Sequence, residues 1–375
     1  MPPTGADTIL AVNAGSSSLK ITLFDNDAAL HRRSAATVER ITVRGGPPDF
    51  DAALGRALEQ IATQGPITAS AAGHRIVHGG AEHAEPEAIT PALLADLHRL
   101  EPIDPNHLPQ ALSLIDAMGR RYPNLRQYAC FDTAFHRTMP RVSQQYPLPR
   151  STWDAGVRRY GFHGLSCESI VSGVREIDAQ AARGRMLIAH LGNGASVTAV
   201  HNLASVDTTM GFSPTGGLMM GTRSGDLDPT VLTYLARSGS CTLEELEHLV
   251  TAEAGLLGVS GVSSDMQDLL SRADSADARD AIALYCYTAR KHIGAMAAAL
   301  NGIDTMVFTG GIGEHASAIR AGICTGLEHL GVALDAEANA ASRPVISRAN
   351  AAVTVRVMKA DEDLIIARHV RRLLA

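Results

Sequence analysis

Residues 8–25 constrain the fold more than any other stretch of the sequence, because two short apolar segments flank a small polar turn. The segments Ile9 to Val12 and Leu19 to Phe24 are rich in β-forming residues and predict the two strands of a hairpin. The turn between them is therefore expected to be held rigidly at a strand end.

The side chains of this turn suit an anion. Gly15 lets the backbone approach closely, Ser16 to Ser18 offer hydroxyl and N–H groups, Asn13 offers an amide, and Lys20 adds a point charge suited to phosphate. The turn is thus interpreted as a phosphate-binding hairpin. The alternative from these residues alone is an ordinary serine-rich turn.

Two further glycine clusters follow apolar strands. Residues 190–196 repeat the order strand, glycine turn, strand, and residues 309–314 follow a strand and open a helix, where exposed N–H groups favour an anion. One similar hairpin in each half suggests duplicated domains that close on a nucleotide. Neither cluster is a dinucleotide fingerprint, and no Gly-x4-Gly-Lys-Ser/Thr motif occurs, so each cluster alone could also be a structural turn.

The rest of the chain alternates short apolar strands with helical segments, which is typical of an α/β fold. Helices are predicted to begin at Thr90-Pro91 and Asp228-Pro229, to span 278–300 as a long, buried, alanine-rich helix, and to span 362–374 at the C-terminal end. Six further strands are predicted at 71–78, 127–132, 186–191, 196–201, 306–309 and 353–358.

Composition limits the class of protein. A chain of 375 residues with 45% apolar content is expected to make two domains. The proline-rich break at 147–151 is predicted to divide them into residues 1–149 and 150–361, and helix 362–375 is expected to pack back on the first domain. Five cysteines without metal-ligand spacing, and no signal or membrane segment, predict a cytoplasmic protein. A net charge of −6 argues against nucleic acid or membrane partners.

Charged residues also occur in four glycine- and aromatic-rich segments, at 73–80, 131–136, 160–164 and 219–229. Phosphoryl transfer needs cations at the equatorial oxygens, a magnesium ion and alignment of donor with acceptor. The arginines and histidine of these segments fit that need. Alternatively, Arg75 forms a strand-end ion pair, for example with Asp132, and His163 is a core histidine.

Taken together, these segments resemble the acetate kinases, which belong with butyrate and propionate kinases to the acetate and sugar kinase, Hsp70 and actin superfamily. The resemblance spans essentially the whole chain and keeps the family order of motifs. The motifs that carry it are at 12–20, 73–80, 131–136, 160–164, 190–194, 221–229 and 310–314.

The resemblance implies a duplicated βββαβαβα core in two domains with an interdomain cleft, and a homodimer. It also implies reversible transfer of the ATP γ-phosphoryl to acetate. Arg75 would bind the acetate carboxylate, while Arg223 and His163 would contact the phosphoryl. Asp132 would orient an arginine or the acceptor. Val77, Ile103, Phe162 and Pro214 would receive the acetate methyl, in a pocket that should also admit propionate.

The resemblance further implies a site for ATP or ADP and a Mg²⁺ site, at which Mn²⁺ is an alternative. Asn13 and Glu362 would hold the metal, directly or through water; the other reading of Glu362 is a match to a helix dipole. The residues implied at the nucleotide are Lys20, His190, Leu191, Gly192, Asn193, Gly194, Asp265, Met266, Gln267, Gly311, Ile312, Gly313, Glu314 and His315.

Some positions depart from the family pattern. Asp104 stands where the family commonly has an active-site histidine, unless His107 supplies the ring, and a carboxylate there would repel phosphate. Gln267 replaces a usual arginine near the nucleotide, which removes a cation and a planar stacking group. Cys167 and Thr215 are departures that look peripheral.

Three alternatives follow. The chain could be a kinase of propionate, butyrate or another short carboxylate, or could use pyrophosphate as donor. It could be a nucleotide-dependent binding or chaperone-like module of the same fold, although paired arginines and a small apolar pocket argue against this. It could also be a relative in which Asp104 and Gln267 mark weakened catalysis.

Overall fold

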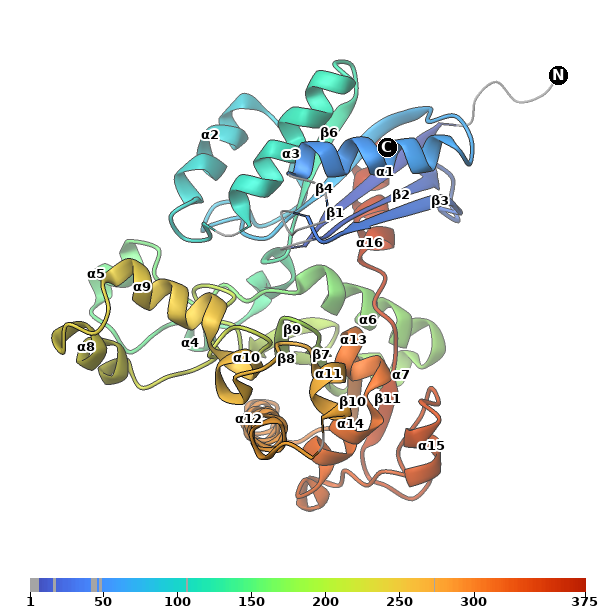
Figure 1. The fold of residues 1–375 in the computed structure, drawn as a ribbon. Helices are drawn as coiled ribbons and strands as arrows, with labels where there is room; N and C mark the ends of the chain where they lie inside the picture. The colour runs from blue at the N-terminus through green and yellow to red at the C-terminus, as the bar shows by residue number, and fades with distance from the viewer. Residues whose placement is uncertain (1–6, 16–17, 42–45, 47–48, 106, 273) are drawn as a thin grey trace. The chain divides into compact units, whose positions relative to one another are not determined.

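The computed structural model describes the chain from residue 7 to 375, except residues 16–17, 42–45, 47–48, 106 and 273 (Figure 1). The chain divides into two compact units. Unit 1 comprises Met1–Phe135 with Asp361–Ala375, and unit 2 comprises His136–Ala360. Each unit is built on its own β-sheet flanked by helices, so the predicted α/β class is confirmed.

The sheet of unit 1 has the strand order β3-β2-β1-β4-β6-β5. Strands β1, β2 and β3 are antiparallel neighbours, whereas β4 runs parallel to both β1 and β6. The elements are β1 (Thr8–Ala14), β2 (Ser18–Asp25), β3 (Arg32–Glu39), α1 (Phe50–Ala62), β4 (Ala69–Ile76), β5 (Glu87–Ala88), α2 (Pro91–Leu100), α3 (Leu108–Arg121), β6 (Arg126–Phe131) and α16 (Glu362–Leu374).

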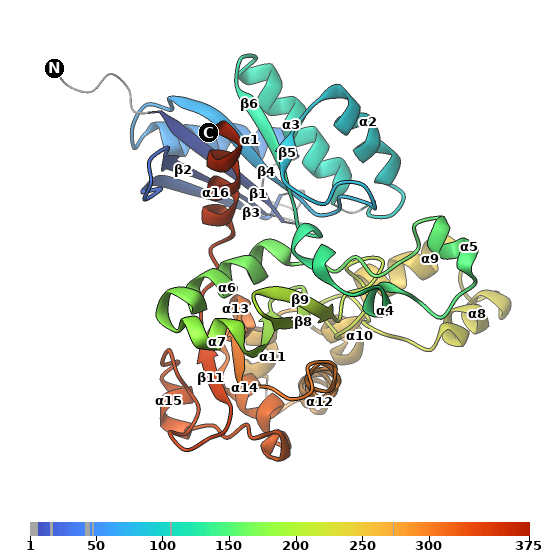
Figure 2. The ribbon, with the colours of Figure 1, turned by 180° about the vertical axis from the view of Figure 1, so that it is seen from behind.

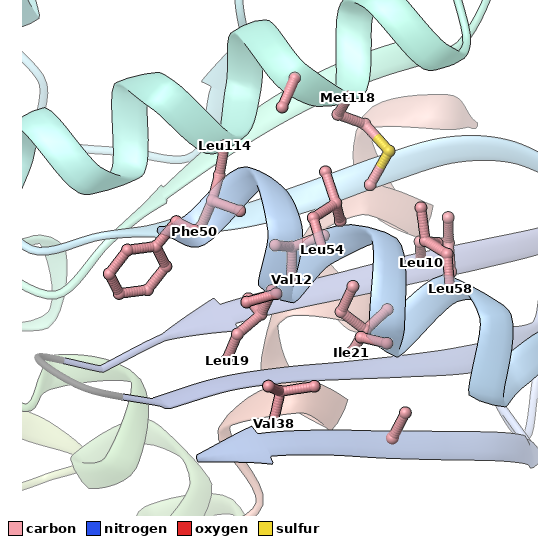
Figure 3. Close-up of a cluster of buried hydrophobic side chains, with 14 of the residues drawn as sticks. Leu10, Val12, Leu19, Ile21, Val38, Phe50, Leu54, Leu58, Leu114 and Met118 are labelled. Carbon is pink, nitrogen blue, oxygen red and sulfur yellow. The ribbon is translucent and has the colours of Figure 1, made fainter. Parts of the chain in front are cut away.

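Helices α1 and α3 cover one face of this sheet and form its main core (Figure 3). Because side chains alternate along a strand, Leu10 and Val12 of β1 and Ile21 of β2 point to the same face, where they meet Leu54 of α1 and Met118 of α3. All five side chains are almost fully buried. This packing favours one register of the β1–β2 hairpin, because a slip of one residue would turn these side chains away from α1 and α3.

Helix α16 packs against β1 and β4 on the opposite face of the sheet (Figures 1 and 2). The contact is close because Gly73 of β4 has no side chain. A methyl group at Gly73 would lie only 2.5 Å from Cγ2 of Ile366 and 2.5 Å from Cγ2 of Val370. The C-terminal helix therefore has the predicted bounds and packs on the N-terminal sheet, where its first turn lies beside the end of β1.

Unit 2 repeats this arrangement. Its sheet has the order β11-β10-β7-β8-β9, with β7, β8 and β9 antiparallel and β10 parallel to both β7 and β11. Followed from the β9 edge, the order β9-β8-β7-β10-β11 corresponds to β3-β2-β1-β4-β6 of unit 1, so the duplicated core implied by the resemblance is confirmed. The strands are β7 (Arg185–Leu191), β8 (Ala195–His201), β9 (Ala204–Thr208), β10 (Thr305–Thr309) and β11 (Thr354–Val357).

Helices make up much of the remainder of the second unit. The long helix α12 packs on β7, β8 and β9, but only one side of it is buried: Leu284 and Tyr287 are 40% and 54% exposed, so the prediction of a buried helix was wrong in this respect. The helices are α4 (Arg141–Gln144), α5 (Arg150–Asp154), α6 (Gly164–Ile177), α7 (Ala179–Arg183), α8 (Pro229–Arg237), α9 (Leu243–His248), the π-helix Leu249–Glu253, α10 (Gly255–Ser260), α11 (Met266–Ser271), α12 (Ala276–Ala299), α13 (Gly310–His315), α14 (Ser317–Cys324) and α15 (Ala336–Ala340), with 3-10 turns at Ala134–Thr138 and Glu328–Leu330.

The division between the units differs from the sequence-based boundary. The chain passes into unit 2 at His136, before the proline-rich break at 147–151. The reason is tertiary contact: His136 Nδ1 lies 2.9 Å from Ser205 Oγ, and Arg159 Nη1 donates to backbone carbonyls of 208–210, so this segment packs against β9 and the residues after it. A local break in regular structure does not reveal such contacts.

All eight predicted strands and the four predicted helices are present with bounds within a few residues, and Thr90 and Asp228 are N-caps as expected. Sequence reasoning missed β3, β5 and β9. In β3 the inward residues are only Ser34, Ala36 and Val38, a weak alternating signal behind two arginines. Among the described residues, no helix combines the length and apolar character that a membrane span requires.

Gly73→Ala tests the close packing of α16. The added methyl group meets two β-branched side chains that have little rotamer freedom in a helix, so we expect a loss of about 1–3 kcal/mol in the free energy of unfolding. Gly55→Ala in α1 is the control, because its methyl group lies 3.7 Å from a flexible arginine and should stabilise by about 0.5–1 kcal/mol. Urea denaturation measures both; a neutral Gly73→Ala would contradict the packing.

Candidate active site

The parallel strands of unit 1 end beside one another and bring Arg75 and Asp132 together. Arg75 lies near the end of β4, and Asp132 directly follows β6. Arg75 Nε and Nη2 donate to Asp132 Oδ2 at 2.9 and 2.6 Å, and Nη1 donates to the carbonyl of Ala14 at 3.1 Å. Asp132 is fully buried and only 16% of the Arg75 side chain is exposed, so the guanidinium is held rigidly at the end of β4.

The charges around Arg75 are predominantly negative. Burial works to lower the pKa of Arg75, but the carboxylates of Asp132, Glu362 and Asp104 outweigh burial, so the pKa is raised. The guanidinium is therefore permanently cationic, and these three carboxylates partly neutralise it.

Asp104 is one of these carboxylates and is paired with the histidine that follows it in the sequence. Asp104 is 3% exposed, and its Oδ1 lies 2.7 Å from Nδ1 of His107, whereas Oδ2 accepts no hydrogen bond from any described residue. The carboxylate orients the imidazole, whose side chain is 15% exposed. The position that departs from the family pattern thus carries an Asp–His pair and not an isolated carboxylate.

The first turn of α16 lies beside the end of β1. Asn13 Nδ2 donates to Glu362 Oε2 at 2.9 Å and to Asp363 Oδ1 at 3.2 Å. Asp363 is 1% exposed and also accepts from Thr22 Oγ1 and pairs with Lys20 Nζ at 2.8 Å. The two residues predicted to hold a metal, Asn13 and Glu362, are therefore in contact, and Lys20 is engaged by Asp363.

The turn between β1 and β2 is the predicted phosphate-binding turn. Gly15 N donates to the carbonyl of Ser18 at 2.8 Å, which closes the turn. Ser16 and Ser17, predicted to offer hydroxyl and N–H groups, lie outside the described residues.

In unit 2, a second group of predicted residues surrounds the β7–β8 turn. His163 lies at the start of α6 in the left-handed conformation, with φ of 58°. Its Nδ1 lies 2.9 Å from Ser196 Oγ, and its ring stacks on His190 with centroids 4.1 Å apart. His190 Nδ1 in turn lies 2.8 Å from Ser166 Oγ. Two serines thus fix the orientation of both rings.

Gly194 lies between His163 and Arg223. A methyl group at Gly194 would lie 3.2 Å from His163 Nε2 and 3.5 Å from Arg223 Nη1, so both side chains point at this glycine. Arg223 Nη1 also donates to the carbonyl of Pro214 at 2.9 Å. An imidazole and a guanidinium therefore converge beside an open backbone, an arrangement that suits a tetrahedral anion.

Next to this group is a cavity of about 590 Å³. The β7–β8 turn and the start of α13 meet at its wall, since a methyl group at Gly192 would lie 4.0 Å from the nitrogen of Gly311. None of the described residues that line it is a lysine or an arginine, in keeping with the replacement at Gln267. The cavity is lined by Gly192, Asn193, Ser264, Asp265, Met266, Gln267, Leu270, Gly311, Ile312, His315 and Ala316.

The structure brings the predicted residues together within each unit. Eight of the predicted nucleotide residues line the cavity, and His190, Leu191, Gly194, Gly313 and Glu314 lie in the same strand, turn and helix as those eight. The four predicted apolar residues are divided: Val77 and Ile103 belong to unit 1, and Phe162 and Pro214 to unit 2. Val77, Phe162 and Pro214 are buried and Ile103 is half-buried.

Sequence reasoning missed several residues that hold this geometry. Asp363 has the clearest signal, since it follows Glu362 in an acidic run, but its burial under β1 and β2 depends on tertiary packing. Ser166 and Ser196 gave no signal, because serines near glycine turns are common. The Asp104–His107 pairing follows from an i, i+3 spacing that sequence alone leaves open.

Two repeated sheets with glycine turns at their strand ends, and an arginine and a histidine that converge on one of these turns, define a phosphotransferase with a duplicated α/β core. A sequence model of the Acetokinase family matches residues 8–368. The chain is 42% identical over 399 residues to an acetate kinase of Rhodopseudomonas palustris, covering 98% of each, and 42% identical over 379 residues to that of Micrococcus luteus, covering 96% and 97%.

Solved structures of acetate and propionate kinases have a fold similar to that of this chain. The acetate kinase of Porphyromonas gingivalis has a TM-score of 0.87 at 35% identity, covering 99% of this chain and 100% of that one. A propionate kinase from Francisella tularensis has a TM-score of 0.88 at 30% identity, covering 97% and 98%. The chain belongs to the Acetokinase family and is a kinase.

The buried histidines give a test of the environment beside the site. Desolvation lowers the pKa of His136 to about 4, partly opposed by the hydrogen bond of Nε2 to the carbonyl of Phe162. An unfolded histidine has a pKa of 6.5, so between pH 6.5 and about 4 the unfolded chain binds a proton that the folded chain does not. Stability is therefore complete above pH 6.5 and falls as the pH falls.

We expect this histidine to remove up to about 3 kcal/mol of the free energy of unfolding between pH 7 and 4. Urea denaturation at a series of pH values measures the slope, and His136→Gln should flatten it. His74, whose pKa burial also lowers to about 4, contributes separately in unit 1 and remains in that variant. An unchanged slope in His136→Gln would contradict the assignment of a neutral buried ring.

Proposed function

We propose that the protein is an acetate kinase that transfers the γ-phosphoryl of ATP to acetate, reversibly and by direct in-line displacement. A carboxylate oxygen of acetate forms a bond to the γ-phosphorus as the bond from phosphorus to the β–γ bridging oxygen breaks, giving acetyl phosphate and ADP. The observation that carries the proposal is the match to the Acetokinase family over residues 8–368. The arrangement of side chains within each unit suggests the role of each residue.

Unit 1 supplies the groups for the acceptor. Arg75 binds the acetate carboxylate through its guanidinium, which lies at the end of β4. Asp132 holds that guanidinium through two hydrogen bonds from Nε and Nη2. Because a fixed cation requires little reorganisation when charge develops, this pair favours the transition state more than a mobile arginine would.

Unit 2 supplies the groups for the phosphoryl. Arg223 and His163 donate to the equatorial oxygens, where charge is spread in a metaphosphate-like transition state. Gly194 lets the phosphoryl approach, since any side chain there would fill the space beside His163 Nε2 and Arg223 Nη1. Ser196 engages Nδ1 of His163, so Nε2, on the Gly194 side, is the ring nitrogen that would face the substrate.

The donor set fits a magnesium ion. Mg²⁺ prefers oxygen ligands and often takes only one or two carboxylates, with water and substrate phosphate completing its shell. Glu362 and the amide of Asn13 lie together at the end of β1 and would hold it directly or through water. Mn²⁺ is an alternative. When bound, the ion would neutralise charge on the phosphates.

The cavity of unit 2 is proposed to hold the nucleotide, with the glycine turns of 192–194 and 311–313 near the phosphates and residues 265–267 near the base. Lys20 would add a charge from the first hairpin. Since none of the described residues of this wall is a lysine or an arginine, recognition of the base depends on hydrogen bonding and apolar contact.

The acceptor is proposed to be acetate, with propionate as a second substrate. Val77, Ile103, Phe162 and Pro214 would contact the methyl group. One additional methylene changes binding by only about 1–3 kcal/mol, so such a pocket discriminates poorly. A propionate kinase among the similar structures is in keeping with this overlap.

We also propose a homodimer and a cytoplasmic location. Helix α8 buries none of its side chains within the chain, and Val231 and Tyr234 on it are 43% and 70% exposed, beside Leu243 at 77%. Such a patch is typical of a subunit interface.

The proposed cytoplasmic location rests on the cysteines. All five are free, which suits a reducing compartment. The net charge of −6 gives no footprint for nucleic acid.

A substrate and donor panel tests the function. Steady-state rates with acetate, propionate and butyrate, each with ATP and with pyrophosphate, should be highest for acetate with ATP. Turnover of ATP that is independent of any carboxylate would instead favour a nucleotide-dependent binding module, and a preference for pyrophosphate would contradict the proposed donor.

Arg223→Ala and Arg75→Ala should each lower the carboxylate-dependent rate by a factor on the order of 10³, as the loss of a transition-state cation does. Circular dichroism and thermal unfolding check that the fold is retained. Wild-type turnover in either variant would remove that arginine from the mechanism.

His107→Ala tests the pair at the departing position. Removing the ring leaves the buried Asp104 carboxylate without its hydrogen-bond partner near Arg75, so it should repel anions and lower kcat/KM for acetate by about tenfold or more. The double variant Asp104→Asn/His107→Ala removes the charge and should recover part of that loss. The control is His98→Ala at the exposed His98–Glu101 pair, which should change nothing. No recovery in the double variant would contradict a charge effect.

A further inference from the structure

Arg320 of α14 is fully buried, although arginine rarely is. Its five donor hydrogens make five hydrogen bonds. Nη1 donates to the carbonyls of Gly313 and Glu314, both at 2.9 Å. Nε donates to Asn339 Oδ1 at 2.8 Å, and Nη2 donates to the Asn339 carbonyl at 2.7 Å and to Ser342 Oγ at 2.9 Å. The guanidinium is thus completely satisfied.

All five acceptors are neutral oxygens, so this is not an ion pair. The charge is balanced by carbonyl dipoles, in particular those at the C-terminal end of α13, where the last carbonyls have no partner within the helix. Burial lowers the pKa of Arg320, yet arginine stays protonated in proteins. Because desolvation of the charge opposes folding, a buried arginine adds less stability than an apolar side chain of similar volume. Its hydrogen bonds, however, specify one arrangement of its neighbours.

The element that Arg320 holds is the wall of the nucleotide cavity. Helix α13 is fixed at its start by the hydrogen bond from Gly310 N to Glu314 Oε1, at 3.1 Å, and at its end by Arg320. From this helix, Gly311, Ile312 and His315 line the cavity. Arg320 itself does not line the cavity and lies behind this helix.

We propose that Arg320 is a positioning residue for nucleotide binding: it fixes α13, and through α13 the cavity wall, without touching the nucleotide. The inference rests on the proposed function of the cavity. A lysine could reach only some of the five acceptors, because its three hydrogens radiate from one atom and lack the planar fork. The carbonyls it leaves unpaired would let α13 shift.

The experiment compares Arg320→Lys with Arg290→Lys. Arg290 of α12 is a matched control, because its Nε and Nη2 donate to the carbonyls of Ile323 and Gly322 at the C-terminal end of α14, away from the cavity. Binding of Mg-ADP is measured by calorimetry well below the unfolding temperature, and KM for ATP and for acetate by steady-state kinetics. Thermal unfolding of each variant measures its loss of stability, so that the two variants can be compared at a known difference in stability.

We expect Arg320→Lys to weaken Mg-ADP binding and raise KM for ATP on the order of tenfold, with KM for acetate within about twofold. Arg290→Lys should leave all three within about twofold, even at an equal loss of stability. Equal nucleotide affinity in Arg320→Lys and wild type would overturn the inference. If the wild-type protein itself does not bind Mg-ADP, the proposed function fails instead.

A second variant keeps the inference testable if Arg320→Lys does not fold. Ser342→Ala removes one of the five acceptors and leaves the guanidinium in place. It should raise KM for ATP by about two- to threefold, with KM for acetate unchanged. A wild-type KM for ATP in a folded Ser342→Ala protein would then overturn the inference.

Discussion

The parallel alignment of neighbouring strands is the constraint on which the rest of this structure depends. Because β4 runs parallel to both β1 and β6, the carboxyl ends of these strands meet, and Ala14, Arg75 and Asp132 are brought within hydrogen-bonding distance. The same alignment of β7 with β10 places the turn after Leu191 beside Gly310 and Gly311. Ligand sites at this edge of a sheet are a general property of open α/β folds.

Local sequence was sufficient to predict the parts of this architecture that local physics decides. The hairpins at 8–25 and 185–201 combine β-forming residues with glycine turns, and Thr90 and Asp228 are capping residues followed by proline, so both kinds of element could be predicted. Strand β3 could not, because its inward residues include only one large apolar side chain, Val38. Its place in the sheet depends on β2, which no local pattern encodes.

The candidate site shows the same limit. Arg75, Asp132, His163 and Arg223 could be singled out because charged residues in glycine-rich segments are unusual. The residues that support the site have ordinary surroundings in the sequence. Ser196, which orients His163, and Arg320, which holds α13, become informative only when burial and hydrogen bonds are known. At Asp104, sequence suggested electrostatic repulsion, whereas the structure supplies a histidine partner.

The last helix belongs by its contacts to the first unit, and this has a consequence for biosynthesis. A nascent chain that has not yet released residues 361–375 lacks the helix that packs on β1 and β4, so Asn13 and Lys20 have not yet met their carboxylate partners. Domains otherwise tend to mature in order from the N-terminus during translation. Here the first unit gains its last helix only after the whole of unit 2 has been synthesised, so the groups at the end of β1 are assembled last.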